Sequence, residues 1–224
     1  MGDYYSSKLS GQRLRLCYEI APPRVQRYLQ AEIAFVLERV SPSFLVLELG
    51  CGYGRVMERL AGKACRVVGI DTSRDSLRMA QEYIGLRSSC QLIQMNAAAL
   101  GFRDRCFDVV ACIQNGISAF NIDRRNLIQE AVRVTRPGGT VLFSSYSQRF
   151  WPHRLEWFRT QAQHGLIGPI DEQATGGGVI VCKDGFRATT VSPDEFTSLL
   201  SEYPLPPKII EVDRSSLFCE ISVV

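Results

Sequence analysis

Residues 46–54 decide the fold, and they read Val46-Leu47-Glu48-Leu49-Gly50-Cys51-Gly52-Tyr53-Gly54. An apolar run broken only by a glutamate is typical of a strand buried on both faces. Three glycines at alternate positions follow, and glycine permits positive φ and close approach of a ligand to the backbone. A helix predicted from residue 55 would point its free N–H groups at such a ligand. The stretch therefore predicts a strand, a ligand-binding turn and a helix.

Two ligand classes use a turn of this kind. Dinucleotide-binding enzymes carry G-x-G-x-x-G, but the sixth position counted from Gly50 is Arg55. Asp71 lies 21 residues after Gly50, at the end of the next predicted strand. A carboxylate there can accept hydrogen bonds from both hydroxyls of a ribose, although an Asp before a Ser is also a common helix N-cap. Order and spacing together favour a nucleoside ligand other than a dinucleotide.

Two later segments extend this pattern. The first is Met95-Asn96-Ala97-Ala98-Ala99-Leu100-Gly101-Phe102, and the second is Cys106-Phe107-Asp108-Val109-Val110-Ala111-Cys112-Ile113-Gln114-Asn115-Gly116. With the E-x-G-x-G-x-G turn and Asp71, and with Arg136-Pro137-Gly138-Gly139 further on, residues 44–147 resemble the class I S-adenosylmethionine (SAM)-dependent methyltransferases. That family commonly has Asp where this chain has Asn96, and the Asp accepts a hydrogen bond from the adenine amino group. The amide oxygen of Asn96 can accept this hydrogen bond without the charge.

The resemblance implies SAM as cofactor and S-adenosylhomocysteine as product. It implies that Asp71 meets the ribose, that the segment at Asn96 closes over adenine, and that the backbone from Ile113 to Asn115 faces the sulfonium. The cofactor-binding residues that follow from it are Glu48, Gly50, Cys51, Gly52, Gly54, Asp71, Thr72, Asn96, Ala97, Ile113, Gln114 and Asn115.

Strands alternating with helices predict an α/β fold with a doubly wound sheet. The expected architecture is a Rossmann-like, seven-stranded, mostly parallel sheet whose last strand is antiparallel. We expect an N-terminal helical cap over residues 1–43 and a SAM-binding core over residues 44–147. An insertion over residues 148–191 would act as a substrate lid, and residues 192–224 would form a final helix with strands 6 and 7.

Smaller elements follow from local signals. The insertion should contain a helix over residues 150–164 and a hairpin over residues 179–191, where Asp184-Gly185 is a strong turn signal. In the core, a helix is expected over residues 124–135, stopped by Pro137-Gly138-Gly139, with a strand over residues 140–145.

Composition narrows the classes of partner. The 224 residues carry a net charge of only +3, which disfavours nucleic acid and anionic membranes as partners. No apolar stretch approaches the roughly 18 residues of a membrane span. The eight cysteines show no CxxC spacing, so we expect no metal site and unpaired thiols. These features predict a cytoplasmic protein, as monomer or homodimer.

The methyl acceptor is predicted to be a small molecule, attacked by in-line displacement. Positioning supplies much of the rate of such a reaction, so the sequence singles out no catalytic residue. Aromatic and polar residues of the N-terminal segment and the insertion could line the acceptor site: Tyr4, Tyr5, Tyr18, Tyr146, Trp151, His153 and Arg187. The same motifs also allow a protein methyltransferase or a SAM-binding protein without catalysis.

Overall fold

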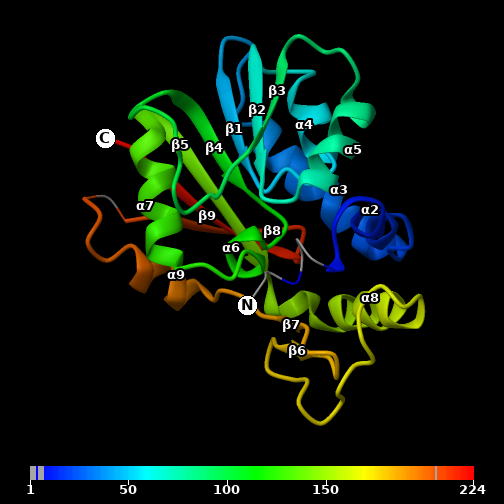
Figure 1. Cartoon of the computed structure of the whole chain (residues 1–224). Coiled ribbons are helices and arrows are strands. Elements are labelled where there is room, and N and C mark those ends of the chain that lie inside the picture. The colour runs from blue at the N-terminus through cyan, green and yellow to red at the C-terminus, as the bar shows by residue number, and fades with distance from the viewer. Residues whose placement is uncertain (1–3, 5–7, 205) are drawn as a thin grey trace.

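A seven-stranded sheet with helices on both faces organises the molecule (Figure 1). The computed structural model describes residues 4, 8–204 and 206–224. The strand order is β3-β2-β1-β4-β5-β9-β8, in which β1 to β5 pair in parallel and β9 runs antiparallel to both neighbours. The strands are β1 (Leu45–Leu49), β2 (Arg66–Asp71), β3 (Cys90–Gln94), β4 (Phe107–Cys112), β5 (Thr135–Tyr146), β8 (Lys208–Val212) and β9 (Ser216–Ser222). The predicted fold class is confirmed.

Alternating side chains on the strands build a hydrophobic core on each face of the sheet. On β1, Val46 packs into one core with residues of α3 (Pro23–Leu37), α4 (Arg55–Leu60) and α5 (Arg74–Ile84). Leu47 packs into the other, together with residues of α7 (Arg124–Val134) and α9 (Pro193–Leu199). Because both faces are covered, the strands carry the nearly continuous apolar runs seen in the sequence.

A third hydrophobic cluster joins the N-terminal segment to the insertion. It contains buried residues of α2 (Gly11–Glu19), of the start of α3 and of α8 (Trp151–Gln163). The cluster includes Tyr28 and Phe150, whose ring centroids are 5.0 Å apart. The short hairpin of β6 (Ile180–Val181) and β7 (Arg187–Ala188) closes the far side, and a 3₁₀ turn, η1 (Gln148–Phe150), leads into α8. The two segments expected to cover the site therefore share one core.

Two helix starts follow the local sequence. The Ser73 side chain accepts a hydrogen bond from the Ser76 N–H and caps α5. Ser192 and Glu195 form a reciprocal capping box at the start of α9, where Pro193 occupies the first turn.

The segment after α7 differs from the prediction. The helix ends at Val134, and β5 already begins at Thr135 and runs through Pro137-Gly138-Gly139. The Thr135 hydroxyl donates to the Ala131 carbonyl, and the pairing with β4 shifts between Phe107 and Val109. The Pro-Gly-Gly stretch is thus accommodated in an irregular part of the strand, where proline needs no ladder partner.

All eight cysteines are unpaired. Among the described residues, no helix is long and apolar enough to cross a membrane.

Candidate active site

A cavity of about 420 Å³ lies where the parallel strands end, under α2 and α8. Consecutive strands of the sheet each contribute to its lining: Asn96 follows β3, Asp71 ends β2, Gly50 follows β1, Gln114 follows β4 and Tyr146 ends β5. Ten of the twelve predicted cofactor residues line it, namely Glu48, Gly50, Cys51, Gly52, Asp71, Thr72, Asn96, Ala97, Ile113 and Gln114. This is the crevice in which open α/β sheets bind ligands.

The glycine turn adopts the backbone that the sequence predicts. Gly50 has φ 74°, and a Cβ there would clash with the Phe120 ring, which also lines the cavity. Gly54 has φ 88° and is the N-cap of α4. A Cβ at Gly54 would instead meet Ile84 of α5 at 2.7 Å. The first glycine is therefore required at the cavity, whereas the third permits two helices to pack.

Two backbone N–H groups hold the Asp71 carboxylate in place. Its Oδ2 accepts a hydrogen bond from the Gly52 N–H at 2.9 Å, and its Oδ1 accepts one from the Ser73 N–H at 2.8 Å. Asp71 also lines the cavity, and a carboxylate oxygen can accept more than one hydrogen bond. Asp71 is not the N-cap of α5, because Ser73 occupies that position.

Three residues of the lining carry buried polar atoms without a hydrogen-bond partner among the described residues. They are Glu48 Oε2, Arg55 Nη2 and Gln114 Nε2. Burial raises the pKa of Glu48 to about 8, an effect that the nearby Arg55 charge opposes. Buried polar atoms are normally satisfied, so a ligand is the natural partner here. An acceptor, a cation and an amide donor together suit the ammonium and carboxylate of an amino acid.

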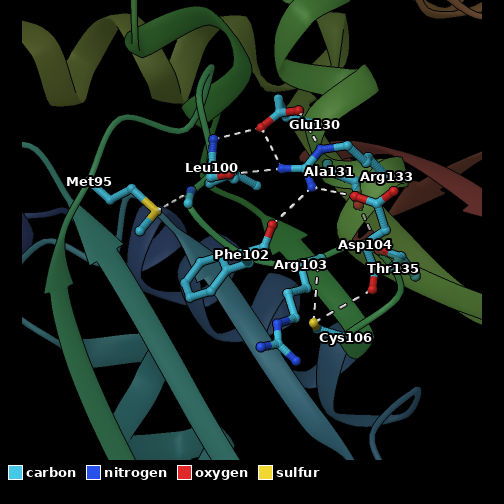
Figure 2. A network of polar contacts seen from close by, with 11 residues as sticks. Met95, Leu100, Phe102, Arg103, Asp104, Cys106, Glu130, Ala131, Arg133 and Thr135 are labelled. Atoms are coloured by element: carbon cyan, nitrogen blue, oxygen red, sulfur yellow. Dashed lines mark hydrogen bonds and ion pairs between the residues drawn. The ribbon is translucent and has the colours of Figure 1, made fainter.

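The segment that follows β3 is fixed by a polar network that sequence reasoning missed (Figure 2). Arg133 on α7 donates to the carbonyls of Leu100 and Phe102 at 2.8 and 2.9 Å, and Glu130 accepts from the Leu100 N–H at 2.6 Å. Arg133 also pairs with Asp104. The network holds the loop beyond Asn96, whose Oδ1 accepts from the Ala98 N–H.

The turn after β4 separates two predicted residues. Gln114 and Asn115 both have positive φ, at 58° and 63°. The Asn115 side chain is buried away from the cavity, donating to the Thr189 carbonyl and accepting from the Ser145 hydroxyl. The Gln114 N–H donates to the buried Glu32 carboxylate at 2.6 Å. Only Ile113 and Gln114 of this turn line the cavity.

The predicted acceptor residues divide into two groups. Tyr18 and Tyr146 line the cavity. Tyr5 lies outside the described residues. The other four are placed elsewhere. Trp151 packs near Arg154, and His153 is half-buried beside Glu156. Arg187 is exposed on β7, and Tyr4 donates a hydrogen bond to Asp184 in a separate hollow.

Residues that the sequence did not single out complete the lining beside Tyr146. They are Trp157, Phe158 and Gln161 of α8. Trp157 and Gln161 are four residues apart, a spacing that places two side chains on the same face of a helix. This spacing could have predicted that they line the site together.

Comparison with known proteins is consistent with this geometry. Residues 46–139 match the family model described as a methyltransferase domain. The 2-methyl-6-phytyl-1,4-hydroquinone methyltransferase of Synechocystis sp. is 29% identical over 148 residues, which are 62% of this chain and 46% of that protein. A ubiquinone biosynthesis O-methyltransferase of Nitrosomonas europaea is 30% identical over 58% of this chain and 53% of its own length. The chain spans about half the length of these curated relatives.

A solved structure extends the similarity to nearly the whole chain. The DhpI-SAM-HEP complex is 25% identical, covers 97% of this chain and 93% of its own, and has a TM-score of 0.64. The expected class I, Rossmann-like fold is confirmed, and the similarity of residues 46–139 to a methyltransferase domain agrees with the expected family and with SAM as cofactor.

Proposed function

We propose that this chain, whose residues 46–139 form a domain of the SAM-dependent methyltransferase family, transfers a methyl group from SAM to a small-molecule acceptor. The observation that carries the proposal is the grouping of Glu48 Oε2, Arg55 Nη2 and Gln114 Nε2, unpartnered among the described residues, around the glycine turn. Similarity to a hydroquinone methyltransferase and to an O-methyltransferase of ubiquinone biosynthesis supports a small acceptor.

The residues present fit SAM from one end to the other. Asp71 would accept hydrogen bonds from the ribose hydroxyls, and the segment of Asn96 and Ala97 would border the adenine. Gly50 would leave room for the ligand against the backbone. The methionine end, with its ammonium and carboxylate, matches the unpartnered atoms of Glu48, Arg55 and Gln114 in charge and hydrogen-bonding type.

The chain's own contribution to transfer is positioning and exclusion of water. SAM supplies an activated methyl group on a positively charged sulfur. Since the strand order runs from Asn96 through Asp71 and Gly50 to Gln114, a cofactor bound in this direction presents its methyl group near the end of β4. The cluster shared by α2 and α8 closes the cavity over that point and would hold the acceptor in line with the methyl group.

Location and partners follow from the same properties. A nearly balanced charge supports the absence of a nucleic-acid partner, and eight unpaired thiols support a reducing, cytoplasmic location. We expect a monomer or a homodimer.

Calorimetric titration with SAM and S-adenosylhomocysteine tests the proposal. Asp71→Asn keeps the size of the side chain but removes the charge, and should weaken SAM binding by about 10-fold or more, equivalent to about 1.4 kcal/mol. Asp194→Asn, an exposed residue on α9, is the matched control and should bind as the wild type does. Absence of SAM binding by the wild type would overturn the proposal.

A further inference from the structure

The two ends of the cavity differ in charge. Its acidic and basic lining residues are Glu48, Arg55 and Asp71, which come from β1, α4 and β2. The wall formed by the N-terminal segment, the end of β5 and α8 contributes no charged side chain among the described residues. Its members are Leu9, Leu14, Cys17, Tyr18, Tyr146, Trp157, Phe158 and Gln161. Apart from the Arg55 guanidinium, which lies 4.6 Å from the Tyr18 ring centre, the cavity lining offers no charged partner at this wall, so the wall favours an uncharged molecule.

The aromatic side chains of this wall are fixed before any ligand arrives. The Trp157 indole N–H donates to the Cys17 carbonyl at 2.9 Å, which ties α8 to α2. The ring centroids of Tyr18 and Trp157 are 6.0 Å apart. Tyr146 packs on Tyr28 with 5.3 Å between ring centroids, and the Arg154 guanidinium lies 4.5 Å from its ring centre. Rigid aromatic rings around a cavity favour a flat aromatic ligand by ring packing.

One polar side chain interrupts the apolar wall. Gln161 is only 3% exposed, lines the cavity, and makes no side-chain hydrogen bond to another described residue. Its amide atoms are therefore open to the cavity rather than sealed within the protein. Its amide has both a donor and an acceptor, so it suits a hydroxyl, which is also both.

We propose that the acceptor is an uncharged aromatic molecule with a ring hydroxyl, held between the aromatic wall and the Gln161 amide; this rests on the proposed function. In the transfer, the ring oxygen forms a bond to the methyl carbon while the bond from that carbon to sulfur breaks. The electron pair of the broken bond stays on sulfur, which becomes a neutral thioether. The hydroxyl proton is released to solvent, so the positive charge of the sulfonium leaves as that proton.

Binding to the protein saturated with S-adenosylhomocysteine tests this directly. The probe is 2,3-dihydroxynaphthalene, and its saturated counterpart decahydronaphthalene-2,3-diol has the same hydroxyls without the flat ring. The wild type should bind the aromatic diol and bind the saturated one at least about 10-fold more weakly. With SAM in place of the product, the aromatic diol should yield a methyl ether and S-adenosylhomocysteine.

Gln161→Leu isolates the polar contact. It should weaken binding of the aromatic diol by about 5- to 100-fold and leave the Kd for SAM unchanged. Gln163→Leu, an exposed residue at the end of the same helix, is the matched control and should change neither value.

The outcomes separate the two proposals. If the wild type binds SAM but prefers the saturated diol or binds neither diol, the aromatic acceptor is wrong while the proposed function stands. An equal loss of SAM and diol binding in Gln161→Leu would place that amide at the cofactor and also overturn the inference. No binding of SAM by the wild type would refute the proposed function itself.

Discussion

Glu32 should make the stability of the protein depend on pH in a window set by its burial. This residue of α3 is fully buried. Its Oε2 accepts from the Gln114 N–H at 2.6 Å and from the Ser144 hydroxyl at 3.0 Å, and its Oε1 accepts from the Ser216 hydroxyl at 2.7 Å. Burial raises the pKa of Glu32 to about 7, although these hydrogen bonds act in the opposite direction.

The size and sign of the effect follow from the two pKa values. Below pH 4.5, the folded and the unfolded protein both carry the proton. Between pH 4.5 and 7 the unfolded protein releases it while the folded protein retains it, so the free energy of unfolding falls as pH rises. The total loss is about 3 kcal/mol, of which about 2.5 kcal/mol lies between pH 5 and pH 8.

Urea denaturation of the wild type and Glu32→Gln at pH 5 and pH 8 measures this loss. Glutamine cannot ionise, but its amide oxygen can still accept from the Gln114 N–H. The wild type should therefore lose about 2.5 kcal/mol more than the variant between the two pH values. Glu48 titrates in both proteins, so its contribution cancels from the comparison.

A control and a contrary result make the test decisive. Glu202→Gln removes an exposed carboxyl and should leave the pH dependence of the wild type intact. Parallel stability curves for the wild type and Glu32→Gln would refute the reasoning, because they would mean that folding leaves the proton affinity of Glu32 unchanged.

Two further substitutions test the elements that shape the cavity. Arg133→Ala removes the hydrogen bonds to the Leu100 and Phe102 carbonyls, so we expect a loss of about 1–3 kcal/mol in urea denaturation and weaker SAM binding. Unchanged SAM affinity in that variant would show that the loop beyond β3 holds its place without the network. Gly50→Ala combines φ 74° with a Cβ against the Phe120 ring and should lower the free energy of unfolding by at least about 1–2 kcal/mol. Adding Phe120→Ala should recover the steric part; an unaltered stability of Gly50→Ala alone would contradict the account.

The cofactor side of the molecule was predictable because its signals are local. The turn of Gly50 and the carboxylate of Asp71 each follow a buried strand, and parallel strands bring their carboxyl ends to one edge of the sheet. Spacing in the sequence is enough to place such residues together. The role of the Asn115 backbone stays a prediction, but its side chain points away from the cavity for a local reason, since Gln114 and Asn115 both have positive φ.

The residues that support the site were missed because their partners are remote in the sequence. Glu32 accepts hydrogen bonds from Gln114, which follows β4, and from Ser216 of β9. These residues meet α3 only in the folded sheet. A sequence signal existed, because Glu32 falls on the apolar stripe of α3 beside Leu29 and Ile33. A carboxylate on such a face indicates a buried partner, but the identity of the partner depends on the strand order.

The strand order also explains why the acceptor end carries no motif. Crossovers place β3, β2, β1, β4 and β5 in line, so in the proposed complex a nucleoside held at Asn96 and Asp71 would extend toward Gln114. The acceptor would then approach the methyl group from beyond β4, on the side of Tyr146, which ends β5 shortly before the insertion. Substitutions in α8 can change this wall without touching the residues around Gly50 or Asp71. Under the proposed function, the residues around Gly50 and Asp71 would be constrained by SAM, whereas the wall that includes Gln161 could differ with the acceptor.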